Sequence, residues 1–127
     1  MVEWKLIRFT KVEGEGRGND RMRAFNIDLN ISDIRKTGND LRVDFSHRVD
    51  YGDDVGFIML SGFLLAGGKP SELRDIQDKW ADKKLPPGFA SDLTNAIMFN
   101  CEVNGVLVTR VLNMPAPVVP PQIGMRS

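Results

Sequence analysis

The stretch that decides the fold is LPPGFASDLTNAIMFNCEVNGVLVTRVLNMPAPVVPPQI, residues 85–123. It predicts one long helix that starts at Pro86–Pro87, where a missing backbone N–H costs nothing. No proline interrupts residues 89–112, a run long enough for a helix of roughly 24 residues. Pro115 prevents the helix from continuing, so residues 114–127 are predicted to form a proline-rich extended tail.

This helix is apolar on more than one side. One stripe at helical spacing consists of Leu93, Ile97, Cys101, Val108 and Leu112. Further apolar residues lie off that stripe, namely Ala90, Ala96, Phe99, Val103 and Val106. A helix that is apolar on several sides is usually buried on several sides. The second side therefore faces another subunit or a bound client, or it belongs to one fully covered core, and the sequence leaves these alternatives open.

The composition indicates a single globular domain over residues 1–127. The chain is 42% hydrophobic and 27% charged, which argues against disorder. Its 17 basic and 17 acidic residues give no bias toward nucleic acid or an acidic membrane surface. A single cysteine excludes an internal disulfide, and no apolar run reaches membrane-spanning length. Because the start, MVEWKLIRF, lacks the apolar block of a signal peptide, we expect a cytoplasmic protein.

Four strands are expected before the helices. They are Trp4–Val12, Met22–Ile34, Leu41–Tyr51 and Val55–Leu65. The second and third alternate apolar and polar residues, as antiparallel strands with one solvated face do. The fourth, VGFIMLSGFLL, is apolar on both faces and is therefore expected to be covered on both sides. The glycine-rich segment at residues 14–18 predicts a hairpin loop after the first strand.

A short amphipathic helix is expected between the strands and the long helix. Pro70 opens the segment SELRDIQDKWADKK, in which Leu73, Ile76 and Trp80 share one stripe. Runs of strands followed by runs of helices are typical of α+β folds. We therefore predict a four-stranded antiparallel sheet followed by a short and a long helix packed on one face.

The motifs that would carry catalytic or metal chemistry fail on inspection. The loop Gly67–Ser71 lacks the glycine and lysine spacing of a phosphate-binding loop. His47 lies on the apolar side of its strand, where a core histidine is expected, and a lone histidine with the lone Cys101 does not make a zinc site. We predict no enzymatic activity, no cofactor and no metal.

The charged residues indicate ordinary surface chemistry. Asp50, Asp53 and Asp54 gather at a predicted turn, where such residues are common, and a weak cation site is the alternative. Arginines in the first half alternate with aspartates, as cross-strand charge pairing on a solvated sheet face requires, so no nucleic-acid partner is expected. Pro117 and Pro120 have PxxP spacing, which suits either a docking ligand or an extended arm lying on a subunit.

The second half of the chain resembles the SecB family of protein-export chaperones. The resemblance rests on the apolar strand VGFIMLSGFLL with its interior glycine, the long helix NAIMFNCEVNGVLVTRVLNMP and the tail LNMPAPVVPPQI. The earlier strands agree with the family only in pattern. The better-known bacterial members carry an acidic C-terminal extension, whereas this chain ends in GMRS. We therefore expect a minimal or distant member, of the type associated with toxin–antitoxin systems or found in archaea.

The resemblance implies a nucleotide-independent holdase chaperone that binds non-native polypeptides as a homo-oligomer, either a dimer or a tetramer, with protein export as one context. We expect exposed apolar residues to form the polypeptide-binding site, since promiscuous binding needs adaptable apolar surface. The expected residues are Trp4, Phe57, Met59, Phe63, Val118, Val119 and Ile123. The alternative is a dedicated interaction protein or antitoxin-associated factor with one specific partner.

Overall fold

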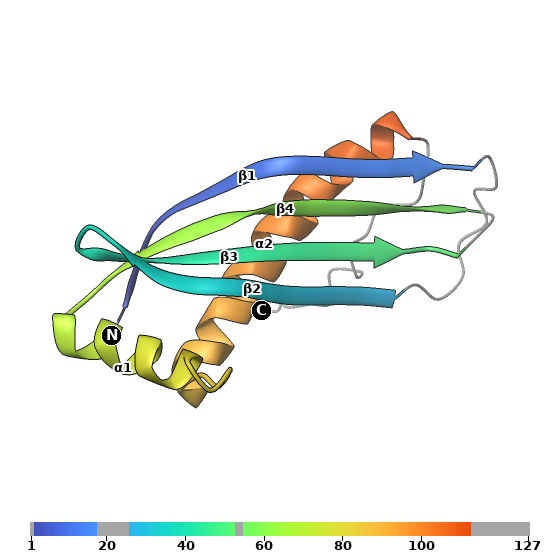
Figure 1. Ribbon diagram of the computed structural model, residues 1–127. Coiled ribbons are helices and arrows are strands. Elements are labelled where there is room, and N and C mark those ends of the chain that lie inside the picture. The colour runs from blue at the N-terminus through green and yellow to red at the C-terminus, as the bar shows by residue number, and fades with distance from the viewer. Residues whose placement is uncertain (1, 18–25, 53–54, 113–127) are drawn as a thin grey trace, which may run out of the picture.

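The computed structural model describes residues 2–17, 26–52 and 55–112. Its elements are β1 (Glu3–Gly16), β2 (Asn26–Thr37), β3 (Asp40–Asp50), β4 (Gly56–Gly67), α1 (Pro70–Trp80) and α2 (Pro87–Val111). The four strands form one antiparallel sheet in the order β1-β4-β3-β2. The long helix α2 runs obliquely behind the sheet, and α1 lies near one end (Figure 1). The predicted α+β arrangement is confirmed.

One face of the sheet, the inner face, carries the core. Alternate residues of the two central strands are buried there: Leu41, Val43, Phe45, His47 and Val49 from β3, and Ile58, Leu60, Leu64 and Ala66 from β4. The helices cover this face with Leu93, Ile97 and Cys101 of α2 and with Leu73 and Ile76 of α1. The strand period of two and the helical period of 3.6 residues therefore meet in a common core, as the sequence predicts.

The long helix begins and ends close to its predicted limits. Pro86 caps it, Pro87 is its first residue and it runs for 25 residues to Val111. Its buried side includes Leu93, Ile97 and Cys101, which confirms the first predicted stripe. The predicted tail, residues 114–127, lies outside the described residues.

The predicted hairpin loop is wrong at residues 14–16, which belong to β1, and residue 18 lies outside the described residues. Strand β1 continues to Gly16 and pairs with β4, so β1 and β2 are the two opposite edges of the sheet. The glycines allow a close approach instead of a turn. A Cβ on Gly14 would lie 2.8 Å from Cδ1 of Leu112, and one on Gly16 would lie 2.6 Å from the Leu112 backbone oxygen. Small residues at these positions therefore let β1 pass beneath the end of α2.

The interior glycine of β4 has a similar role. A Cβ on Gly62 would overlap the backbone oxygen of Arg8 and touch Phe9 on the neighbouring strand. The pairing of β1 with β4 shifts register next to this point, between Phe9 and Lys11. An irregular crossing of this kind needs a residue without a side chain. Gly62 therefore sets how closely β1 can approach the middle of the sheet.

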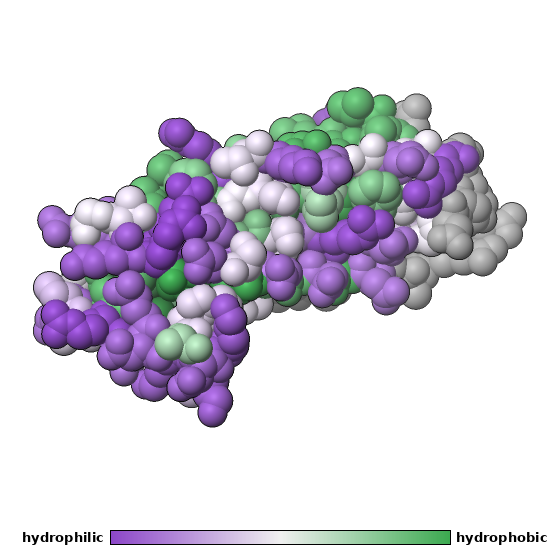
Figure 2. All heavy atoms as spheres, in the orientation of Figure 1, coloured by the Kyte–Doolittle hydropathy of each residue, from purple (hydrophilic) through white to green (hydrophobic). Residues whose placement is uncertain are grey.

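The expectation that β4 is covered on both sides is also wrong. Its inner-face residues are buried, but its alternate residues, which include Phe57, Met59 and Phe63, are only half-buried. We call their side of the sheet the outer face. No helix or second sheet covers the outer face within the described residues. In the space-filling view, apolar and polar side chains lie side by side across it (Figure 2).

Candidate functional site

The outer face brings together three of the side chains that the sequence predicts to bind polypeptide. Phe57, Met59 and Phe63 lie on alternate positions of β4, a central strand of the sheet. Leu65 continues the row, and Leu6, which is 38% exposed, pairs with it from β1. The result is an apolar row along the middle of an otherwise polar sheet surface.

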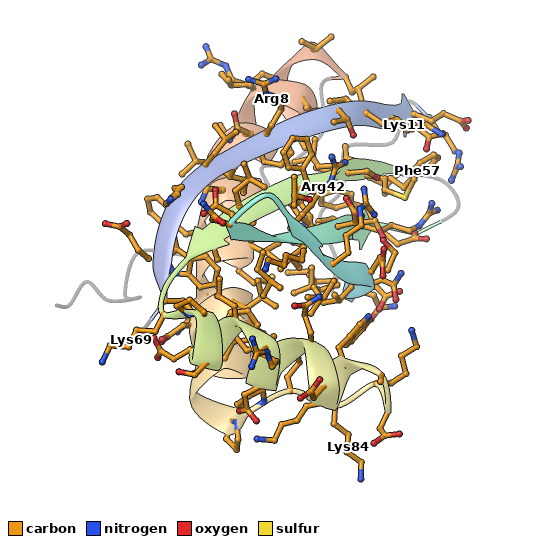
Figure 3. All side chains as sticks on the ribbon, turned by 60° about the vertical axis from the view of Figure 1, so that its left-hand side comes forward. Arg8, Lys11, Arg42, Phe57, Lys69 and Lys84 are labelled. Carbon is orange, nitrogen blue, oxygen red and sulfur yellow. The ribbon has the colours of Figure 1, made fainter. Side chains whose placement is uncertain are left out.

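Arginines from the adjacent strand β3 lie over the rings of this row. The guanidinium carbon of Arg42 is 3.9 Å from the centre of the Phe63 ring, and that of Arg48 is 4.1 Å from the centre of the Phe57 ring. Both distances fit cation–π stacking. Arg42 and Phe57 are visible on this face in Figure 3, with Arg8 and Lys11 on β1 beside them. The arginines cover the ring faces in place of a second protein layer.

Carboxylates of β3 hold these guanidinium groups in place. Arg42 Nε donates to Asp44 Oδ1 at 3.0 Å, and Arg35 of β2 donates to Asp44 Oδ2 at 2.7 Å. Arg48 Nη2 donates to Asp50 Oδ2 at 3.4 Å. The cations are therefore fixed by local partners, and the outer face is amphipathic without a strong net charge.

The Gly52 end of the outer face has its own fixed geometry. The backbone N–H of Gly52 donates to Asp50 at 2.9 Å, and this bond, together with Arg48, holds the pKa of the Asp50 carboxyl below its usual value. The other two acids of the predicted turn cluster, Asp53 and Asp54, lie outside the described residues. Asp50 therefore acts here as a turn residue and an arginine partner.

The remaining predicted binding residues do not join this row. Trp4 lies on the inner side of β1, where its ring packs 5.7 Å from that of Phe89 at the start of α2. Val118, Val119 and Ile123 lie outside the described residues. The structure therefore groups Phe57, Met59 and Phe63 and separates Trp4 from them.

Sequence reasoning predicts that the arginines of this surface pair with aspartates, but it misses their stacking on the phenylalanines. Arg42 and Arg48 alternate with Asp44 and Asp50 along one strand, which is the signal for the pairing. What the sequence does not give is the register that places this strand beside β4 and its phenylalanines. Register decides whether a charge meets a ring or a neighbouring charge.

A second apolar surface lies on the opposite side of the molecule, along α2. It consists of Phe99, Val103, Leu107 and Val111, which are 66%, 53%, 59% and 81% exposed. We call these four residues the α2 stripe. They are spaced four apart and so lie along one track of the helix, on the side away from the buried residues Ile97, Cys101 and Gly105.

The buried polar and thiol groups do not form a reactive centre. His47 is 1% exposed, neither ring nitrogen has a hydrogen-bond partner among the described residues, and burial lowers its pKa. Burial raises the pKa of the Cys101 thiol to about 12, so the thiolate is not available at neutral pH. Groups of three or more histidine, cysteine or carboxylate side chains that could hold a metal are absent from the part of the chain described here.

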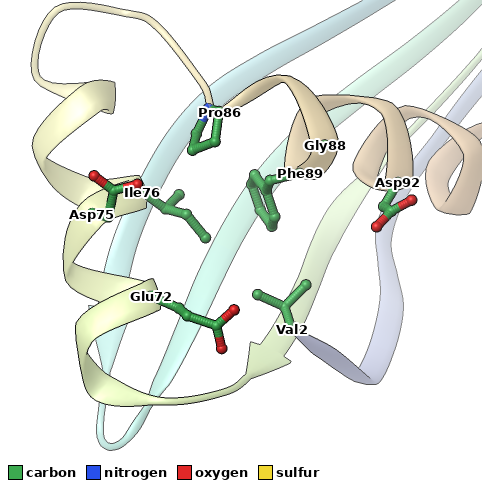
Figure 4. Close-up of a pocket in the computed structure, with 8 residues that line it drawn as sticks. All are labelled: Val2, Glu72, Asp75, Ile76, Pro86, Gly88, Phe89 and Asp92. Atoms are coloured by element: carbon green, nitrogen blue, oxygen red, sulfur yellow. The ribbon is translucent and has the colours of Figure 1, made fainter.

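A cavity of about 300 Å³ lies between the starts of the two helices and the N-terminal residues (Figure 4). Its apolar lining comes from Val2, Ile76 and Phe89, and its polar lining consists of the carboxylates of Glu72, Asp75 and Asp92. Asp75 is already paired with Lys79 at 3.0 Å. No histidine, cysteine or lysine lines this cavity among the described residues, so it does not supply a recognisable set of nucleophile, base and electrophile.

Comparisons of the chain with protein-family models, with curated proteins and with solved structures find no match. In the ranges that the structure describes, neither helix is long and apolar enough to cross a membrane.

Proposed function

We propose that this protein is a SecB-like holdase chaperone, which binds non-native polypeptides without nucleotide and acts as a homo-oligomer in the cytoplasm. The observation that carries the proposal is the apolar row of Phe57, Met59 and Phe63 on the outer face, where no further layer covers it within the described residues. The order of four strands and two helices agrees with the resemblance that the sequence shows. A link to protein export is part of the proposal.

The row suits the binding of unfolded chains for physical reasons. Burial of apolar surface contributes about 25 cal/mol per Å² and requires no particular sequence in the partner. The thioether of Met59 adapts to side chains of different shape. Arg42 and Arg48 lie over the rings with N–H groups at their edges, so they can donate hydrogen bonds to carbonyl oxygens of a bound backbone while the phenylalanines contact its apolar side chains.

The direct test is suppression of aggregation by the full chain and by a Phe57→Ser/Phe63→Ser variant. The readout is light scattering from a denatured model protein diluted into buffer without nucleotide. We expect the wild type to suppress the scattering and the variant to lose most of that effect, because both anchors of the row are gone. Circular dichroism and Tm establish that the variant is folded.

A Val12→Ser variant is the matched control, because Val12 is 55% exposed but belongs to β1 outside the row. It should suppress aggregation as the wild type does. Full suppression by a folded Phe57→Ser/Phe63→Ser variant would show that the outer face is not the client surface.

The fixed arrangement of side chains on the outer face favours a second function. The arginines there are stacked and ion-paired in one defined geometry, and a fixed pattern of charges and rings selects one partner better than many. The protein would then be a dedicated interaction or antitoxin-associated factor. Two unrelated unfolded proteins distinguish the two functions: a holdase binds both, and each displaces the other, whereas a dedicated factor binds neither and co-purifies with one stoichiometric partner.

A further inference from the structure

The α2 stripe needs an explanation that the client surface does not provide. Four large apolar side chains lie more than half exposed along one track of a helix, on the far side of the molecule from Phe57 and Phe63. Side chains of this size are seldom left in water as a contiguous set, and such sets mark contact surfaces. In Figure 2 the C-terminal end of α2 appears as a hydrophobic region beyond the edge strand β1.

The charges beside the stripe are arranged symmetrically about its centre. After Asp92, the only charged residues of α2 are Glu102 and Arg110. They lie on one track with Val106, directly beside the stripe. The midpoint between these two charges is Val106, and the midpoint of the stripe, from Phe99 to Val111, is Gly105. The apolar centre and the charge centre therefore coincide within one residue.

Neither charge has an ion-pair partner among the residues that the structure describes, and they are eight positions apart, too far to meet within one helix. Glu102 is half-buried, and burial raises the pKa of its carboxyl. Arg110 is exposed in the last turn of the helix. A cation placed beside Glu102 would favour its ionised form.

A surface of this kind is complementary to itself in one orientation. When two identical helices pack antiparallel across a two-fold axis, residues of the same flank face each other. An axis near Val106 then sets Glu102 of each copy opposite Arg110 of the other, and it sets Val103 opposite Leu107 or its near neighbours. In a parallel two-fold pair, Glu102 of one copy would lie level with Glu102 of the other, and Arg110 level with Arg110, so neither ion pair would form.

We propose that the α2 stripe binds a second copy of this chain, with the two α2 helices antiparallel and two Glu102–Arg110 ion pairs beside an apolar centre. The inference rests on the homo-oligomer in the proposed function and identifies the surface and orientation that form it. Residues spaced four apart form a ridge, and two such ridges pack at an angle of about 50°. The outer faces of both copies remain free, so self-association and client binding do not compete.

The test is a charge-reversal cycle on the full chain, measured as dimer Kd by light scattering and analytical ultracentrifugation from ~1 to ~100 µM. Glu102→Arg and Arg110→Glu should each weaken the dimer about tenfold, because each substitution acts at two symmetric contacts. The double variant should recover to within about threefold of the wild type, because both pairs are restored with the charges exchanged. Arg74→Glu, an exposed reversal on α1, is the control and should leave Kd unchanged.

A Leu107→Asp variant provides the second measurement. It places a charge at the apolar centre of both copies and should leave only monomer, while Tm of the monomer is unchanged because Leu107 is 59% exposed. A monomeric wild type would overturn the proposal and assign the stripe to a client or to another part of the chain. A dimer that tolerates each single reversal, or a double variant as weak as the singles, would overturn the antiparallel arrangement. Loss of the dimer with retained suppression of aggregation would leave the holdase function intact.

Discussion

The outer face and the α2 stripe both present apolar side chains to the surface, but their surroundings differ. On the outer face each phenylalanine carries an arginine over its ring, and the arginine is held by a carboxylate. On α2 the side chains of Val103 and Leu107 are bare, with Glu102 and Arg110 at the flank. An amphipathic surface whose charges are already paired can contact varied partners, whereas a bare stripe whose flanking acid and base have no ion-pair partner in the described part of the chain matches one complementary surface. The difference separates client binding from self-association.

The largest expected effect distinguishes the two sides of α2. Ile97 is fully buried and Phe99 is 66% exposed. Ile97→Ala should lower the free energy of unfolding by about 3 kcal/mol, because it leaves a cavity in the core. Phe99→Ala should change it by less than about 0.5 kcal/mol. Urea denaturation at about 1 µM, where association contributes little, is the measurement. Similar losses for both variants would mean that the stripe is covered within the monomer.

A smaller effect should follow from a change at Gly62 of β4, where the backbone of β1 passes close to this strand. Gly62→Ala places a Cβ against the Arg8 backbone and should cost about 2–3 kcal/mol, since backbone cannot move aside cheaply. Gly88→Ala is the matched control, because nothing lies within 4 Å of its added Cβ. At that helical position alanine should be neutral or stabilising. A Gly62→Ala variant with wild-type Tm would contradict the close crossing of β1 and β4.

The stability of the protein should decrease in acid because His47 is buried in the core between the two surfaces. Burial lowers the pKa of His47 in the folded protein, whereas the unfolded chain titrates near its ordinary value of 6.5. Below about pH 6.5 the unfolded state therefore binds more protons than the folded state. As the pH is lowered, the free energy of unfolding decreases by at most ~1.4 kcal/mol per pH unit until the pKa of His47 in the folded protein is reached. Urea midpoints from pH 8 to pH 5 measure this loss. A His47→Leu variant should lose this part of the slope, and an unchanged slope would exclude His47 as its source.

The smallest effect concerns the arginines that distinguish the outer face from the stripe. Arg42→Ala removes the group over Phe63 and one partner of Asp44, and it should cost about 0.5–1 kcal/mol. It should also expose the ring and increase binding of an apolar dye. Arg74→Ala on α1 should do neither. Unchanged dye binding in Arg42→Ala would show that the guanidinium does not cover Phe63.

Local periodicity in the sequence was sufficient to predict the elements and the core. Leu93 and Ile97 share a helical stripe, and Val43 and Phe45 alternate along a strand, so each buried face follows from spacing alone. The errors arose where contacts over long distances decide the structure. The sequence places Gly14 in a loop because it does not show that Leu112 lies against this residue.

The binding surfaces could be predicted only in part. The sequence shows the apolar character of Phe57 and Phe63, but it predicts a strand covered on both sides, because nothing in the residues of that strand shows that arginines of β3 lie over one side. Likewise, an apolar second side of the long helix was expected, while its exposure depends on where the sheet stops covering it. Surfaces of this kind are set by register and packing, which a single sequence does not specify.

The most direct measurement is the mass in solution of the wild type, of Phe57→Ser/Phe63→Ser and of Leu107→Asp, with and without a reduced unfolded protein and without nucleotide. We predict a wild-type oligomer that gains client mass, an outer-face variant that stays oligomeric without gaining it, and a stripe variant that is monomeric. A monomeric wild type that ignores the client, or the loss of client binding only in Leu107→Asp, would contradict the assignment of the two surfaces.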